Sequence, residues 1–341
     1  MTPEQFILES LPDDVVASIE ERDAYIRSLP PAGAGVEFVV SDLQKWRPGR
    51  TVRVAFLGGN TTLHREIEEA TQQITVACNL QLDFGRNPST GTYRTWSESD
   101  TDYAAEIRVS FDQGGFFSLV GTDSIDPGIG QPSSPVGGRA GQRSLNLGGF
   151  DVRRPDNWQG VVRHEFMHAL AFHHSHQNLR GPCEQSFRWD DDQGYKQTKN
   201  RSGSFIQDSK GRRPGIYTYL SGPPNGWNKA KVDHNLRRID RDDVTVGPFD
   251  RASIMLYRFP DIFYKQVPSP CAPSGDGLAL SDGDKRALAL MYPHTDEEVT
   301  EANRRNDLLL EAIAPATESM DGVESPDSAM RSRVAAMLRG R

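Results

Sequence analysis

The chain has 341 residues, of which 36% are hydrophobic, and a formal net charge of −8 at pH 7. This composition allows a substantial core, and its mildly acidic balance does not favour nucleic acid or an anionic membrane as a partner. No stretch reaches the roughly 18 consecutive apolar residues that a membrane-spanning helix needs, so we expect a soluble protein.

Three cysteines make an odd number without any CxxC pair, which excludes a cysteine zinc site and a dense disulfide framework. Cys78 lies in an apolar helical register, and we expect it to be buried. Cys183 and Cys271 lie in loop-like sequence and could pair if the protein is exported, although spacing alone does not establish that they are close together.

The two ends of the chain are polar. Residues 1–40 predict a helical leader, a possible pro-segment, that ends in a linker of Pro, Ala and Gly before the main domain over 41–295. Residues 296–341 are charged and contain serine, with two short helical patches, and we interpret them as a mobile polar tail.

The main domain opens with strand and helix patterns. Apolar residues alternate over 52–56, which predicts a strand, and recur at helical spacing over 63–77. A two-residue period returns over 80–84, 107–111 and 145–147. Strands joined by a helix predict an α+β fold in which helices pack against a mixed, twisted sheet.

The second half of the domain is less regular. Residues 180–250 are polar and rich in Gly, Pro and Asn, which predicts mostly loop with one short helix around 229–236. Ser281 and Asp284 form a capping-box pattern, so we expect a helix that closes the domain before Pro293.

A metal-binding pattern lies on a helix predicted over 157–171, for which Asp156 is a plausible N-cap. In the string His-Glu-Phe-Met-His, His164 and His168 are one turn apart on the same face and can bind one zinc ion. Glu165 beside them can hold a water, take its proton during attack on a carbonyl and pass it to the leaving amine. This pattern predicts one catalytic Zn²⁺ with Glu165 as the general base.

A third ligand must follow the helix, where the sequence offers His173, His174 and His176. A chain that turns back toward the metal would deliver His174, ten positions after the first ligand, as in the long metzincin motif. We interpret the other two as bystanders. The alternative is a His-rich helix end that complements the helix dipole or binds metal incidentally, but the motif is more specific than histidine enrichment.

With these motifs the chain resembles a bacterial-type astacin-like metzincin over about Trp46 to Pro293. Ala-Ser-Ile-Met-Leu-Tyr at 252–257 resembles the Met-turn of that family. The resemblance implies that Met255 lies beneath the metal, and that Tyr257 is a switchable ligand which leaves zinc to hydrogen-bond the transition-state oxyanion. Taken alone, Met255 would be an ordinary core methionine.

The resemblance also implies a metzincin catalytic domain over 41–295. Its N-terminal subdomain would extend to about residue 174, and a mostly irregular C-terminal subdomain would cover 175–295. The string Ser-Leu-Asn-Leu-Gly resembles the edge strand of the family's cleft, where substrate binds extended by main-chain hydrogen bonds. The predicted residues of this cleft strand are Leu145, Asn146 and Leu147.

Four positions differ from the family pattern. Ala171 replaces a glycine that turns the chain out of the helix, where a left-handed backbone costs a non-glycine residue about 1 kcal/mol. Ser175 replaces an acidic residue, so the ion pair that this residue makes with a mature amino terminus is not expected. Leu256 replaces a non-ligand His. The family's inhibitory Asp is absent, and Asp42 is in a superficially similar place.

We therefore expect a zinc-dependent endopeptidase that acts as a monomer on proteins or peptides and not on nucleic acid or membranes. One alternative is a zinc-bearing peptide-binding module with weak or no turnover. Another is a metallohydrolase for a different substrate, against which the cleft strand argues. The resemblance implies secretion, yet residues 1–27 show no secretory signal, which leaves leaderless export, a delivered effector or an intracellular peptidase.

Overall fold

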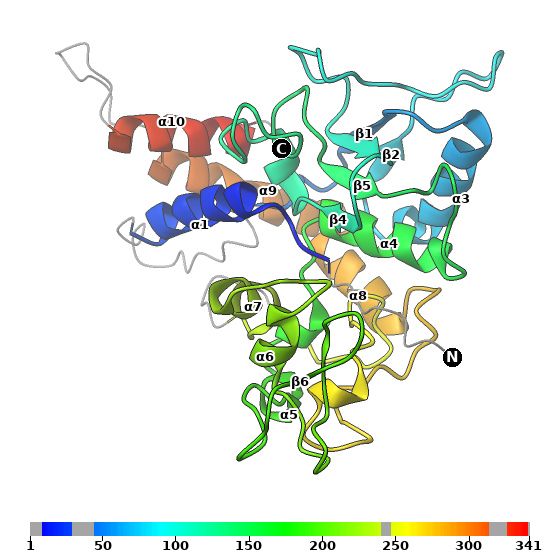
Figure 1. Cartoon of the computed structure of the whole chain (residues 1–341). Helices are drawn as coiled ribbons and strands as arrows, with labels where there is room; N and C mark the ends of the chain where they lie inside the picture. Colours follow the sequence, from blue (N-terminus) through cyan, green and yellow to red (C-terminus); the bar gives the residue numbers. More distant parts are fainter. Residues whose placement is uncertain (1–8, 29–43, 240–246, 314–325, 340–341) are drawn as a thin grey trace. The chain divides into compact units, whose positions relative to one another are not determined.

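The computed structural model describes residues 9–28, 44–239, 247–313 and 326–339 (Figure 1). Asp42 lies outside these residues. The described chain divides into two compact units. The first, here called the sheet unit, takes the described residues of 11–172 and 277–339. The second, the loop unit, comprises 9–10, 173–239 and 247–276.

The sheet unit is built on a five-stranded sheet with the strand order β2-β1-β3-β5-β4. Four strands run parallel, and β4 is antiparallel to its neighbour β5. The sheet is therefore mixed, as the sequence predicted. Its strands are β1 (Thr51–Phe56), β2 (Gln81–Asp83), β3 (Ile107–Ser110), β4 (Phe116–Ser118) and β5 (Leu145–Leu147).

Two helices pack against each other beside this sheet, α3 (Thr61–Ala77) and α4 (Trp158–Ala169) (Figure 1). Helix α3 begins where the side chain of Asn60 accepts the N–H of Leu63, which satisfies one otherwise unpaired donor of the first turn. The apolar positions that predicted this helix are buried, among them Leu63, Ile67 and Ile74. The helical spacing of apolar residues in the sequence therefore predicted correctly which face of α3 is buried.

The prediction that β5 is the edge of the sheet is wrong. Leu145, Asn146 and Leu147 are all buried, and β5 pairs with β3 on one side and with β4 on the other. The edge strand next to β5 is β4, a three-residue strand that follows Gly114 and Gly115. The Asn146 side chain instead donates to the carbonyl oxygens of Gln113 and Gly115, so it holds the turn that leads into β4.

The predicted leader contributes a helix, α1 (Asp13–Ser28), to the sheet unit. Val15 is fully buried in a cluster with Phe117 and Leu119, and Ser18 accepts the N–H of Gly130 at 2.8 Å. An apolar face of α1 is therefore part of the core beside the edge strand.

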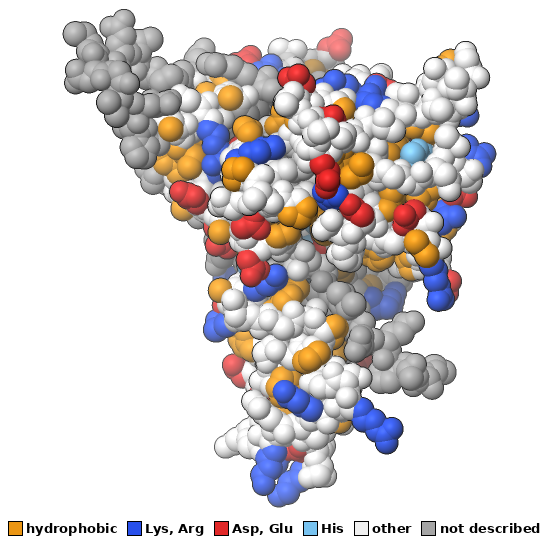
Figure 2. All heavy atoms as spheres, turned by 45° about the horizontal axis from the view of Figure 1, so that its top comes forward, with side chains coloured by type: hydrophobic (Ala, Val, Ile, Leu, Met, Phe, Trp, Pro, Cys, Tyr) orange, Lys and Arg blue, Asp and Glu red, His pale blue; other side chains and the backbone are white. Residues whose placement is uncertain are grey.

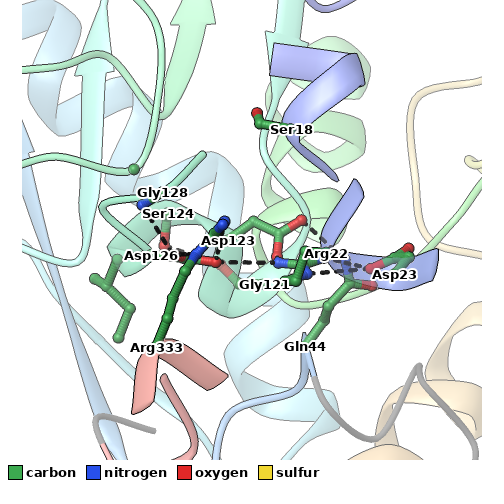
Figure 3. Close-up of polar contacts among 12 residues, drawn as sticks. Ser18, Arg22, Asp23, Gln44, Gly121, Asp123, Ser124, Asp126, Gly128 and Arg333 are labelled. Atoms are coloured by element: carbon green, nitrogen blue, oxygen red, sulfur yellow. Dashed lines mark hydrogen bonds and ion pairs between the residues drawn. The ribbon is translucent and has the colours of Figure 1, made fainter. Parts of the chain in front are cut away.

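Buried charged side chains connect the second half of α1, at Arg22 and Asp23, to other segments of the sheet unit (Figure 3). Arg22 donates to Asp123 in the 3-10 helix η1 (Gly121–Ile125), and its guanidinium lies 3.5 Å from Asp126 and 2.9 Å from Asp23. Arg333, from helix α10 (Pro326–Arg339), pairs with Asp126 at 2.7 Å. Two arginines, Arg22 and Arg333, thus pair with three buried carboxylates, Asp23, Asp123 and Asp126.

The electrostatics of this cluster follow from its burial. Burial raises the pKa of Asp123 to about 6, although Arg22 opposes that shift. Burial alone would lower the pKa of Arg22, but the neighbouring Asp123 and Asp23 raise it well above its usual value. Gln44 also donates to Asp123, at 2.8 Å. The guanidinium of Arg22 therefore stays charged.

The C-terminal segment contains two long helices. Helix α9 (Asp296–Ile313) packs against α10, and both are longer than the short patches suggested by the sequence. The preceding helix α8 (Asp282–Met291) begins with the predicted capping box of Ser281 and Asp284, in which both reciprocal hydrogen bonds form.

The loop unit has little regular structure, as predicted. Cys183 and Cys271 form a disulfide, while Cys78 of the sheet unit is a buried free thiol. Aromatic residues such as Phe187 and Tyr264 pack around the disulfide. The elements of the loop unit are η2 (Ser175–Gln177), α5 (Cys183–Ser186), β6 (Thr198–Lys199), β7 (Phe205–Ile206), α6 (Ile216–Ser221), α7 (Lys229–Leu236) and η3 (Asp261–Phe263).

Among the helices of the described ranges, none is both long enough and apolar enough to cross a membrane. On the face shown in Figure 2, Lys and Arg side chains are interspersed with Asp and Glu side chains.

Candidate metal centre

Helix α4 carries His164, Glu165 and His168, all of which are buried. It begins at Trp158, close to the predicted start, with Asn157 rather than Asp156 at the cap position. A Cβ atom on Gly160 would overlap the carbonyl oxygen of Gly277, so only glycine allows the helix to approach that segment so closely. This contact fixes α4 near its first turn.

The C-terminal end of α4 is a Schellman motif. The N–H of Phe172 donates to the carbonyl of Met167, and that of Ala171 to the carbonyl of His168. Ala171 has a φ of 68° and is, among the described residues, the one non-glycine residue with a positive φ. The left-handed turn predicted at Ala171 therefore forms, at a cost of about 1 kcal/mol relative to glycine.

Two buried side chains bind the last carbonyls of this helix. The indole N–H of Trp46 donates to the carbonyl of Ala169, and the hydroxyl of Tyr292 donates to that of Leu170, each at 2.9 Å. Carbonyls at a helix C-terminus have no partner within the helix, so these two bonds satisfy groups that would otherwise be buried unpaired.

The two histidines of α4 lie with their ring centroids 4.9 Å apart. The Nδ1 atom of His168 is 2.6 Å from the carbonyl oxygen of Phe172. A carbonyl can only accept, so Nδ1 carries the proton and Nε2 keeps the lone pair that a metal requires. The local fold therefore presents His168 in the tautomer of an Nε2 ligand.

The loop unit brings together His174, Tyr257 and Glu9. The rings of His174 and Tyr257 lie 4.4 Å apart. A single carboxylate oxygen of Glu9 is 3.3 Å from Nε2 of His174 and accepts the hydroxyl of Tyr257. Sequence reasoning missed Glu9, because it is one of several acidic residues in the leader and no motif distinguishes it.

The predicted Met-turn is tied to the segment after His174. The N–H of Ser175 donates to the carbonyl of Met255 at 2.9 Å, and its hydroxyl donates to that of Ser253 at 3.0 Å. Met255 itself is buried. Ser175 therefore connects the turn to the chain beside His174, where the family pattern has an acidic residue.

The neighbouring His176 has a different position. It is buried, and its Nε2 atom lies 2.9 Å from the carbonyl oxygen of Asn235. This contact ties η2 to the end of α7.

The candidate metal ligands are His164 and His168 in the sheet unit, and Glu9 and His174 in the loop unit. Imidazole nitrogens with a carboxylate oxygen are a donor set that zinc accepts readily, in contrast to magnesium or calcium, which prefer oxygen ligands. The residues present therefore fit a zinc ion.

No protein-family model and no curated protein matches the chain. Solved structures do. A structure of myroilysin aligns with a TM-score of 0.51 and 25% identity, covering 74% of this chain and 97% of that one. A crystal structure of myroilysin gives 0.42 and 23%, covering 85% and 100%. High choriolytic enzyme 1, a hatching enzyme zinc-protease from Oryzias latipes (medaka fish), gives 0.40 and 16%, covering 79% and 100%.

Of these three, the first has a TM-score above 0.5, and the comparison of folds rests on it. The likeness agrees with the resemblance to astacin-like metzincins that the sequence indicated. The α+β fold class, with a mixed sheet and helices beside it, is confirmed.

Proposed function

We propose that the chain is a zinc-dependent endopeptidase of the astacin-like metzincin type. The observation that carries the proposal is the His-Glu-Phe-Met-His string on α4, with His168 held in the tautomer of an Nε2 ligand. The likeness to myroilysin supports the same assignment through the fold.

In this proposal His164, His168 and His174 hold the metal, which when bound lowers the pKa of a water toward about 7. Glu165 takes the proton from that water during attack on the peptide carbonyl and passes it to the leaving amine. The hydroxyl of Tyr257 donates a hydrogen bond to the oxyanion of the transition state. In the same proposal, Met255 would supply the apolar side chain beneath the metal.

Glu9 restrains this machinery in the described conformation. Its carboxylate accepts the Tyr257 hydroxyl and lies 3.3 Å from Nε2 of His174. Both contacts compete with groups that a substrate needs. We expect Glu9→Ala to increase peptide hydrolysis, and Glu20→Ala, another acidic side chain of the leader, to leave it unchanged.

The deciding experiment replaces Glu165 with Gln in the zinc-loaded protein and measures cleavage of an unstructured protein. Loss of the general base is expected to lower the rate by roughly 10²- to 10⁴-fold, with zinc content unchanged. Glu69→Gln, on the exposed surface of α3, is the matched control and should cleave normally. Proteolysis that persists in Glu165→Gln would eliminate this assignment of the base.

The second candidate is a zinc-bearing peptide-binding module, and the contact of Glu9 with Tyr257 favours it, because this hydroxyl is occupied. Peptide affinity without product at saturating zinc, in Glu9→Ala as well as in the original chain, would support that candidate.

We also propose that the protein acts on protein or peptide substrates outside the cytosol. The disulfide between Cys183 and Cys271 supports this location, because structural disulfides persist in oxidising compartments. Cell fractionation with antibody detection tests it.

A further inference from the structure

We infer that Trp46 and Tyr292 are positioning residues for the metal ligand His168, acting through the left-handed turn at the end of α4. This inference rests on the proposed zinc site and names residues that no metal-binding motif contains. The two side chains come from opposite ends of the sheet unit's sequence, 123 and 122 residues from the carbonyls they bind.

The contacts form one continuous path. Tyr292 and Trp46, both fully buried, fix the carbonyls of Leu170 and Ala169. The next residue, Ala171, turns the backbone into the left-handed region, and the carbonyl of Phe172 then points back to Nδ1 of His168 at 2.6 Å. The direction of that carbonyl sets the ring orientation and tautomer of His168.

The turn needs this support because its own sequence does not favour it. A left-handed Ala171 is strained by about 1 kcal/mol, whereas a glycine would adopt the same backbone without cost. Strained backbone persists where surrounding contacts determine it. The hydrogen bonds from Trp46 and Tyr292 lie immediately before the strained residue, where they oppose relaxation of the turn.

A role in stability alone would predict a different result. Loss of one buried hydrogen bond lowers stability wherever it occurs, whereas loss of a positioning contact also changes the metal site. Tyr93 provides the comparison. It is a buried tyrosine of the same unit whose hydroxyl donates to Glu68 at 2.7 Å, and its partner is on α3, not on α4.

The experiment uses the full chain, stripped of metal with a chelator and titrated with cobalt(II) and with zinc. Tyr292→Phe removes one hydroxyl, and we expect roughly 10- to 100-fold weaker zinc binding, the range typical for lost outer contacts of a metal site. At saturating cobalt, the visible d–d absorption should differ from that of the original protein. Tyr93→Phe should match the original protein in both measurements.

Trp46→Phe is the second variant, because it removes the indole N–H and keeps an aromatic ring. A shifted cobalt spectrum in either variant, at saturating metal and with the fold intact by circular dichroism, supports the inference. Unchanged spectra and affinities in the folded variants overturn it while the proposed enzyme survives. If the original protein takes up neither metal, the proposed function and the inference fall together.

Discussion

The two units differ in what holds them together. The sheet unit relies on regular strands, an apolar core and buried ion pairs, including the cluster of Arg22, Asp123 and Asp126. The loop unit has only short elements, and its core is a cluster of aromatic and aliphatic side chains that includes the disulfide of Cys183 and Cys271. In the loop unit, the disulfide adds stability by reducing the entropy of the unfolded chain. In the sheet unit, buried charges are tolerated because each one is paired.

The largest expected effect is a loss of stability in the loop unit. Replacing Cys183 and Cys271 together with Ala opens a loop of 88 residues, which should cost roughly 4–5 kcal/mol through added entropy of the unfolded chain. Limited proteolysis should then cut first within 173–276. Cys78→Ala, in the sheet unit, is the control and should leave that region protected. Equal protection of 173–276 in the double variant would remove the contrast between the units.

The next effect falls on the sheet unit. Arg22→Gln leaves Asp123 buried without its main cation and should lower the free energy of unfolding by roughly 3–5 kcal/mol. Arg47→Gln is the matched control, since Arg47 pairs with Asp307 at 2.8 Å on the surface, where a pair contributes about 0–1 kcal/mol. Urea unfolding measures the free energy of unfolding of both variants. Similar decreases in the two would show that the buried cluster contributes no more to stability than the surface pair.

A smaller effect is the pH dependence of Asp123. Its folded pKa of about 6 exceeds the usual value of 3.8, so the folded state binds the proton more tightly than the unfolded chain does. This group therefore adds stability as the pH falls from about 7 toward 4, by at most about 1.4 kcal/mol per pH unit. The increment should be absent in Asp123→Asn. Parallel stability curves for the two proteins over this range would contradict the assignment.

The smallest effect concerns the turn after α4. Ala171→Gly should stabilise the protein by up to about 1 kcal/mol, because glycine adopts a positive φ without strain. Ala169→Gly, two residues earlier and within α4, should destabilise by about 0.5–1 kcal/mol. Thermal unfolding gives both values, and the same sign for the two substitutions would contradict the argument from backbone strain.

Much of the sheet unit could be predicted from the sequence, because apolar periodicity reports buried faces. The strand at Thr51–Phe56 and the helix at Thr61–Ala77 were found in this way. In the loop unit, the helix Lys229–Leu236 was also located. The edge strand Phe116–Ser118 was not, since its sequence Phe-Phe-Ser does not alternate apolar and polar residues, and the prediction assigned its place to the adjacent strand.

The candidate site likewise contains residues that could be recognised from the sequence and residues that could not. His164 and His168 could be recognised because their partner is one helical turn away in sequence. Contacts over long separations could not be recognised. Glu9 meets Tyr257 across 248 residues, and Tyr292 meets Leu170 across 122. No local pattern encodes such pairs, because they depend on how the whole chain folds back on itself.

The pairing of Arg333 with Asp126 has a consequence for how the protein is made. These residues are 207 positions apart, and Arg333 lies on α10, which leaves the ribosome after Asp126 does. Asp126 therefore lacks this cation until the 207 positions up to Arg333 have been translated. The charge cluster is therefore complete only after α10 has been made, and a ribosome-bound nascent chain that stops short of α10 should expose the η1 region to protease.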